Sequence, residues 1–272
     1  MKKLLLLSTV TLIGICRISA QDIHLHVNPQ WQECSFQIDS SLTQNEFHQF
    51  AQEGGLILYF RPLIDAKPMG KGQVELSILE WKSKIDEHDG AWNNMFVHPD
   101  STHWLVGGPV LPFPGLTFRA GLTSKLDAGV YWTMRPGANY GVCGLQLQYN
   151  LLNNETTGWS ASGRVSSMYL YGPRDVRVNT FGTDFVASRR FSLLHNHLFF
   201  SPYAGGSLYL SHAQEKAAVV NLHNENRFGA QANVGAVAQV SIVRLAVEYN
   251  LAAVRSLSFK IGVAYAFGKK KE

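Results

Sequence analysis

The stretch that decides the fold runs from residue 228 to residue 242 and reads FGAQANVGAVAQVSI. Apolar residues stand at every second position, and mostly polar or small residues stand between them. This alternation has the period of a β-strand with one apolar face. It continues well beyond the about 4–8 residues of an ordinary half-buried strand. The stretch therefore predicts an unusually long strand whose apolar face is continuous.

Two following segments, from Val243 to Leu251 and from Leu257 to Phe267, repeat the pattern. A strand of about 9–11 residues tilted by ~45° can cross a hydrocarbon core, and only a closed barrel does so without unpaired backbone groups. Phe259 and Phe267 lie roughly 26 Å apart along the last strand, which projects to about 20 Å on a barrel axis. This is close to the ~25 Å apolar band between the aromatic girdles of membrane barrels. A soluble sandwich or a lipocalin-like barrel is the alternative, and three successive long strands with one apolar face argue against it.

Residues 1–20 have the pattern of an export signal. Lys2 and Lys3 precede a mainly apolar run from Leu4 to Ile15, and Ala20 is a small residue where cleavage would occur. The run is shorter than the ~20 residues of a transmembrane helix. Cys16 raises lipoprotein processing as an alternative, although the bulky Ile15 before it argues against that. An exported chain without a spanning helix points to an outer membrane rather than an inner one.

Charge and composition exclude some classes of function. The formal net charge is +4, and Lys2, Lys3 and Arg17 of the expected signal supply three of these charges. No basic field of the kind that nucleic acids need is present, so we expect no nucleic-acid partner. Charged residues make up 16% of the chain, below the ~25% of soluble domains. Mean hydropathy is near zero, as expected when two faces of alternating strands cancel.

Residues 21–71 form an N-terminal extension ahead of the expected barrel, and its part 21–54 does not have the pattern of a barrel strand. Thr43 and Glu46 have capping-box spacing, and Leu42, Phe47, Phe50 and Ala51 then recur near helical spacing until Gly54 and Gly55. We expect a short helix that ends at these glycines. It could plug the barrel lumen or rest at the periplasmic rim, and an ordinary amphipathic helix covering the barrel end is an equal alternative.

Between residues 72 and 268 turn signals separate ten convincing strands, and the run from Leu56 to Arg61 leaves eleven or twelve open. A change of apolar parity between Val178 and Phe181 predicts a bulge near residues 180–182. The prediction is an all-β, antiparallel up-and-down transmembrane β-barrel of about 10–12 strands with a short N-terminal helix, followed by a basic tail at 269–272. The expected strands cover residues 74–81, 116–121, 126–134, 140–151, 159–171, 175–190, 198–211, 228–242, 243–251 and 257–267.

Two long polar stretches, 86–113 and 212–226, are expected outside the cell, because periplasmic turns are short. The first holds Trp92 and Trp104. Cys34 and Cys143 remain after signal removal and could pair in an oxidising compartment. Cys143, however, shares a face with Leu145 and Leu147 and would then look toward lipid. No spacing of metal ligands is present, and we expect no metal and no cofactor.

If the apolar faces look to lipid, polar residues of opposite parity line the lumen. In a narrow barrel such charges pair and fill the interior, because an unpaired buried charge costs several kcal/mol. Passage of a small polar or ionic solute through an open lumen is the alternative. The candidate residues are Arg164, Asp184, Arg227, Gln231, Asn233, Gln239, Arg244, Glu248 and Lys260.

Two other classes of function remain open. Some outer-membrane barrels are lipid A deacylases or phospholipases, and Ser211 next to His212 is the nearest approach to a nucleophile and base here. We expect a non-enzymatic protein, because no nucleophile motif surrounds this pair. A surface adhesin that uses loops 86–113 and 212–226 is the third class, with the tryptophans of the first loop as contact residues.

The chain resembles small outer-membrane β-barrel proteins of Gram-negative bacteria, particularly uncharacterised barrels of Bacteroidetes-like bacteria. The resemblance rests on residues 19–22 at the expected cleavage site, the repeated hairpins, and the closing strand 257–267, which reads LSFKIGVAYAF. Residues 268–272 extend past that strand, which departs from the family pattern. The resemblance implies an outer-membrane location and a structural or passively translocating role. It also implies membrane lipid, lipopolysaccharide and the barrel-assembly machinery as partners, with a small solute added if the lumen is open.

Overall fold

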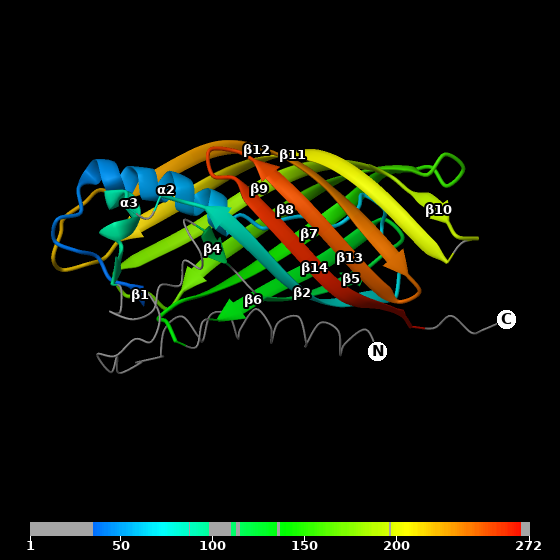
Figure 1. Ribbon diagram of the computed structural model, residues 1–272, viewed down its shortest axis with the longest axis horizontal. Coiled ribbons are helices and arrows are strands. Elements are labelled where there is room, and N and C mark those ends of the chain that lie inside the picture. The colour runs from blue at the N-terminus through cyan, green and yellow to red at the C-terminus, as the bar shows by residue number, and fades with distance from the viewer. Residues whose placement is uncertain are drawn as a thin grey trace.

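The structure is a computed structural model that describes residues 35–86, 88–97, 110–112, 115–134, 137–195 and 197–267. Ten antiparallel strands form a closed barrel (Figure 1). Each strand pairs with its neighbour in the chain, β14 returns to pair with β2, and β9 pairs directly with β11. The barrel strands are β2 (Gln73–Lys84), β5 (Gly115–Gly121), β6 (Leu126–Met134), β7 (Gly141–Asn153), β8 (Trp159–Tyr171), β9 (Val176–Arg189), β11 (Leu198–Glu215), β12 (Glu225–Val240), β13 (Val243–Leu251) and β14 (Ser256–Ala266).

The side chains of each strand alternate between the two faces of the wall, and the apolar ones point outward. On β13, Leu245 is 49% exposed and Val247 is 40% exposed, whereas Arg244 and Glu248 on the same strand are buried. The same order repeats on β14, where Phe259 and Ile261 face outward. A soluble barrel would bury the apolar set, so this wall is built for an apolar surrounding.

Short elements complete the described part of the chain. They are β1 (Ser35–Phe36), α2 (Gln44–Leu58), α3 (Gly90–Asn93), β3 (Phe96–Val97), β4 (Val110–Pro112) and β10 (Phe191–Leu193). β1 pairs with β3, β4 pairs with the end of β2, and β10 pairs with β11, all antiparallel. No helix within the described ranges is long and apolar enough to span a membrane.

Helix α2 begins as the sequence predicts and ends later. The Thr43 side chain accepts the Glu46 backbone N–H, and the Glu46 carboxylate accepts the Thr43 N–H at 2.8 Å, which completes the capping box. The expectation that Gly54 and Gly55 end the helix is wrong, since α2 continues to Leu58. Gly55 serves close packing instead, because α2 lies against β9, β11 and β12 at one end of the barrel.

Gly55 is the position where α2 comes nearest to the wall. A Cβ atom added there would lie 2.5 Å from the Cβ of Ser211 on β11. We therefore expect Gly55→Val to lower the free energy of unfolding by about 1–3 kcal/mol through overpacking. Gly163→Ala is the matched control, because no atom lies within 4 Å of an added Cβ there. Urea unfolding of both variants in detergent measures the difference, and equal stability of the two would contradict this packing.

Several local predictions from the sequence need correction. Leu56–Leu58 belongs to α2 and Tyr59–Arg61 lies inside the barrel, so the additional strand is absent from this described region. The prediction of a bulge near residues 180–182 is wrong, because β9 keeps an unbroken register with β8 and β11. The parity changes because Val176 and Val178 face an apolar interior under α2. A register shift is found instead in the pairing of β7 with β8, between Asn150 and Leu152.

The loop predictions also change in detail. Residues 86–113 contain α3, β3 and β4, although 87, 98–109 and 113 lie outside the described residues. The strand pair β11 and β12 extends to Glu215 and Glu225, which shortens the connecting loop to residues 216–224. Cys143 lies on the outward parity of β7 as predicted, yet it is only 9% exposed, with Trp132 and Tyr169 as its cross-strand neighbours. Its pairing with Cys34 falls outside the described residues.

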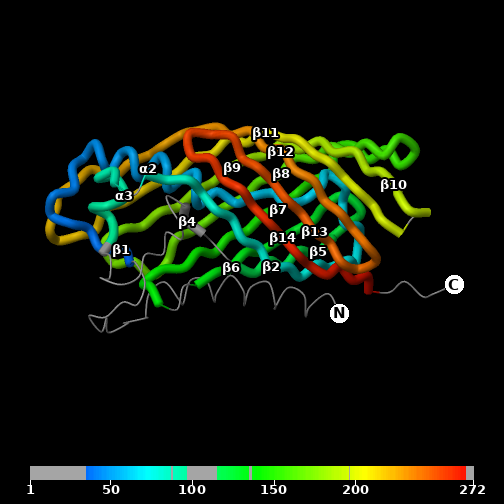
Figure 2. The backbone as a smooth tube through the Cα atoms, in the orientation of Figure 1, coloured from blue at the N-terminus to red at the C-terminus, as the bar shows by residue number. Residues whose placement is uncertain are grey.

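The chain between α2 and β2 runs through the barrel (Figure 2). α2 lies at the end where β2 finishes and the loop with α3 begins. At the opposite end Gly72 donates to the Gly121 carbonyl and accepts from the Phe267 N–H, just before β2 starts. Residues 59–71 therefore connect the two ends of the lumen from within.

Candidate functional site: the occupied lumen

The lumen is filled by the segment Tyr59–Met69, which we call the plug. Of its apolar side chains, Tyr59, Phe60, Leu63 and Ile64 are at most 2% exposed. The plug has no regular hydrogen-bonded structure of its own, so its buried backbone groups need partners from the wall. Inward side chains of the strands supply several of these partners.

The centre of the wall holds a cluster around Arg164 on β8. Its Nε donates to Asp184 Oδ2 at 2.6 Å, and its Nη1 donates to Gln146 Oε1 at 2.7 Å. Its Nη2 donates to the Phe60 carbonyl of the plug at 2.5 Å. The other oxygen of Asp184 accepts from the Ser207 hydroxyl. Arg164 and Asp184 are cross-strand partners, so the ion pair is built into the register of β8 and β9.

A second cluster surrounds Glu75 on β2. Its carboxylate accepts from Lys260 Nζ at 2.6 Å and from Arg244 Nη1 at 2.8 Å. Arg244 also donates to Asp65 of the plug at 3.2 Å. Two cations thus share two carboxylates, three of these groups come from the wall, and one comes from the plug. The cluster neutralises charges that are all buried, which is the condition for their presence in a closed interior.

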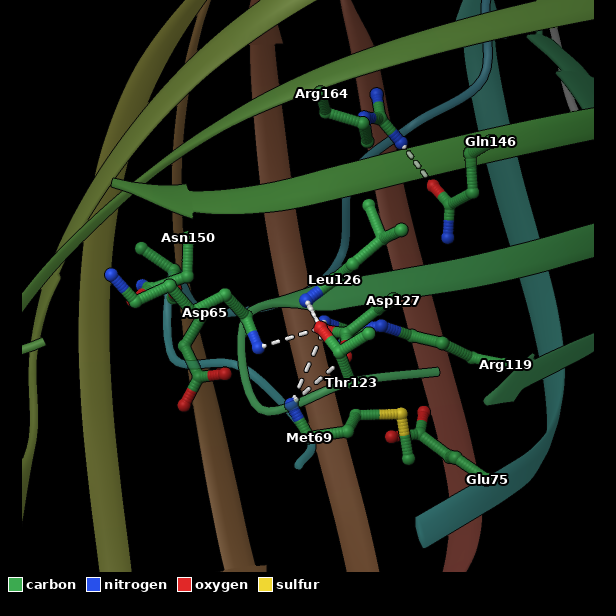
Figure 3. A network of polar contacts seen from close by, with 12 residues as sticks. Asp65, Met69, Glu75, Arg119, Thr123, Leu126, Asp127, Gln146, Asn150 and Arg164 are labelled. Carbon is green, nitrogen blue, oxygen red and sulfur yellow. Dashed lines mark hydrogen bonds and ion pairs between the residues drawn. The ribbon is translucent and has the colours of Figure 1, made fainter. Parts of the chain in front are cut away.

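A third cluster lies nearer the end where the plug leaves the lumen (Figure 3). Arg119 on β5 forms an ion pair with Asp127 on β6. Both oxygens of Asp127 also accept the Met69 N–H, at 3.3 and 3.2 Å. Arg119 and Asp127 are each at most 2% exposed. The same carboxylate therefore pairs a wall cation and holds the plug backbone.

Two further wall residues bind the plug from the other side. Glu248 on β13 accepts the Leu63 N–H at 3.1 Å and the Tyr203 hydroxyl at 2.8 Å. Arg61 of the plug donates to Gln231 Oε1 at 3.2 Å and to the Ser256 hydroxyl at 3.0 Å. Each strand from β12 to β14 thus contributes at least one polar contact around residues 61–63.

The structure places most of the sequence-predicted residues inside the lumen and the others at the ends of the barrel. Arg164, Asp184, Gln231, Arg244, Glu248 and Lys260 are buried and hydrogen-bonded as described above. Asn233 is buried, and neither amide atom has a hydrogen-bond partner among the described residues. Arg227 is half-buried at the end of the barrel where α2 lies, and it donates to Gln52 of α2 at 3.4 Å. Gln239 lies at the far end of β12 and donates to the Ser241 carbonyl.

Sequence reasoning missed Glu75, Arg119, Asp127 and Gln146 as members of the site. Each has the inward parity of its strand, so the alternation that predicted Arg164 could have found them. Arg61 and Asp65 could not be found in this way. They belong to a segment without periodicity, whose place in the lumen only the folded chain reveals.

Three of the residues that carried the enzyme and adhesin alternatives, Ser211, His212 and Trp92, lie within the described chain. The Ser211 side chain is fully buried, whereas His212 bonds to the Asn226 side chain at 2.8 Å near the surface. Adjacent strand residues point to opposite faces, so the two do not form a nucleophile and base pair. Trp92 is only 4% exposed and its indole donates to Glu53 of α2. Trp104 lies outside the described residues, and among those described no three potential metal ligands of the His, Cys, Asp and Glu types gather.

Comparisons with known proteins add little detail. No protein-family model matches the chain, and no curated protein matches it. Among solved structures, the N-terminal β-barrel domain of Pseudomonas aeruginosa OprF matches with 10% identity and a TM-score of 0.29, covering 72% of this chain and 99% of that one. The outer membrane protein OprG from P. aeruginosa matches with 10% identity and a TM-score of 0.31, covering 74% of this chain and 100% of that one. LpxR from Salmonella typhimurium matches with 10% identity and a TM-score of 0.33, covering 72% of this chain and 100% of that one. At these identities and scores the matches carry no argument about activity.

The observation that decides the class is the chain's own geometry. A closed barrel with an apolar exterior and an ion-paired interior inverts the order of a soluble barrel. The chain has the fold of an outer-membrane β-barrel protein. The narrower resemblance of this outer-membrane barrel to those of Bacteroidetes-like bacteria gains no support from the comparisons.

Proposed function

We propose that this chain is an integral outer-membrane protein whose barrel is kept closed by its own plug, so that it acts as a structural membrane protein rather than as an open pore. The observation that carries the proposal is the burial of residues 59–66 between charged wall residues that bind their backbone. A passive pore needs a continuous aqueous path, and side chains of the plug occupy that path. We assign no catalytic activity and no cofactor to the chain.

The partners in this proposal follow from the two faces of the wall. The outward apolar side chains contact membrane lipid, with lipopolysaccharide in the outer leaflet. Insertion of a closed barrel requires the barrel-assembly machinery of the outer membrane. We place the mature chain in the outer membrane after export by the segment 1–20. These partners and this location follow from the fold class and from the sequence pattern.

Conductance in planar bilayers tests the closed lumen. We expect purified wild-type protein to give no conductance steps at any voltage that the bilayer tolerates. We expect a variant in which residues 59–69 are replaced by a Gly/Ser linker of equal length to conduct, because the buried side chains are removed, among them the Asp65 carboxylate that pairs with Arg244. Gly/Ser replacement of the loop 216–224 is the matched control and should stay silent.

The outcome that contradicts the proposal is steady conductance by the wild-type protein. Such a result would favour the passive translocation of small polar solutes. Circular dichroism and heat-modifiable gel mobility show whether each variant keeps its barrel. If the linker variant fails to fold, conductance by the wild-type protein remains decisive.

A further inference from the structure

The described chain begins at one end of the barrel. Residues 36–39 are fixed to three different turns at one end. Gln37 and Asp39 donate to the carbonyls of Met95 and Asn94 in the loop after β2. Phe36 N–H donates to the Asn139 side chain before β7, and Ile38 N–H donates to Asp175 before β9. This end carries the longer loops of the described chain.

The chain then runs from this end of the barrel to the other. After α2 the plug crosses the lumen, and at Gly72 it reaches the other end, where Gly121 and Phe267 bind it. β2 starts there and returns along the wall. In an outer-membrane barrel the short turns face the periplasm and the long loops face outward. The N-terminal segment of the described chain, residues 35–43, therefore stands at the outer face, although β2 begins at the inner one.

Side chains of the barrel wall hold the chain that crosses the lumen. Five wall side chains bind main-chain atoms of the plug, in addition to the side-chain contacts of Arg61 and Asp65. They are Arg164 to the Phe60 carbonyl, Glu248 to the Leu63 N–H, Ser188 to the Ala66 N–H, Asn150 to the Ala66 carbonyl, and Asp127 to the Met69 N–H. Contacts of this kind hold the backbone itself and do not depend on the side chains of the residues that they bind.

We propose that the lumen is a binding site for the backbone of the plug, and that through it the chain carries the segment 35–43 across the membrane and displays the turn at residues 39–43 on the outer surface. The proposal rests on the outer-membrane location given above. The turn suits display, because Asp39, Ser40, Ser41 and Thr43 are all exposed. Its Asp39 carboxylate accepts the Ser41 N–H at 2.8 Å, which lowers the pKa of Asp39 and keeps it charged.

Cysteine labelling on intact cells tests this display. Three single substitutions are made in a background with Cys34→Ser and Cys143→Ser. Ser40→Cys lies in the displayed turn, Ala218→Cys lies in the loop between β11 and β12 at the same end, and Ser124→Cys lies in the turn between β5 and β6 at the opposite end. All three positions are exposed. The background without an added cysteine is the blank, and a membrane-impermeant maleimide is the probe.

The expected result is labelling of Ser40→Cys and Ala218→Cys on intact cells and labelling of Ser124→Cys only after permeabilisation. Labelling of Ala218→Cys without Ser40→Cys would overturn the crossing of the lumen by the N-terminal segment. Labelling of Ser124→Cys alone would overturn the display, because it reverses the barrel. Only heat-modifiable, folded protein is counted. Neither result depends on conductance, so this proposal can fail while the closed lumen stands.

Discussion

Replacing Arg164 by alanine is expected to lower the free energy of unfolding by about 3–5 kcal/mol, which is the cost of leaving a buried partner charge unpaired. The variant removes the ion pair to Asp184, the bond to Gln146 and the bond to the Phe60 carbonyl in one change. Asp184 would stay in a site that is only 5% exposed, with Ser207 as its remaining partner. Urea unfolding of the barrel in phospholipid vesicles, followed by tryptophan fluorescence, measures the loss.

A double variant separates the loss of the ion pair from the cost of leaving one buried charge unpaired. Arg164→Met with Asp184→Leu removes both charges, and we expect a smaller loss than for Arg164→Ala, because no uncompensated charge remains. Lys125→Ala, in the exposed turn between β5 and β6, controls for the loss of a surface cation and should be close to neutral. A loss for Arg164→Ala no larger than that for Lys125→Ala would show that the cluster does not hold the plug.

Replacing Val247 by arginine is the second large effect that we expect. Val247 faces outward on β13, between Ala236 on β12 and Phe259 on β14. An arginine on the lipid face costs about 2–4 kcal/mol near the bilayer midplane and about 0–1 near the interface. We therefore expect a loss in that upper range from urea unfolding in vesicles.

Ala253→Arg is the matched control for this second prediction. Ala253 is exposed in the short turn between β13 and β14, at the end of the barrel. The same change of side chain should there cost little. If Val247→Arg were as harmless as Ala253→Arg, the outward face would be meeting water rather than lipid.

The barrel itself could be predicted because its signal is local and repeated. Alternation along β13 and β14 specifies which residues face lipid, and turn residues mark most strand ends. The same parity located Arg164, Arg244 and Lys260 on the inner face, where the structure finds them buried. Each of these inferences needs only the period of a strand and a closed wall.

The plug could not be predicted for a physical reason. Tyr59 to Met69 has no regular period, because its partners are wall side chains distant in sequence rather than its own neighbours. Leu56–Arg61 is rich in apolar and aromatic residues, so it has the pattern of a strand, although burial in the lumen gives the same composition. Gly54 and Gly55 have the local pattern of a helix end, and the packing of Gly55 against Ser211 is a long-range contact that this pattern does not contain.

The central claim, that alternate residues of the strands face lipid and a filled interior, is tested most directly by spin labels along β14. Single cysteines from residue 257 to 263 are labelled in vesicles, and collision with oxygen, which concentrates in lipid, is measured. We expect high oxygen accessibility at the outward positions 257, 259, 261 and 263, and low accessibility to oxygen and to a water-soluble relaxant at 258, 260 and 262. Oxygen accessibility without this period of two would contradict the lipid-facing wall, and free access of the water-soluble relaxant at 258 and 260 would contradict the filled lumen.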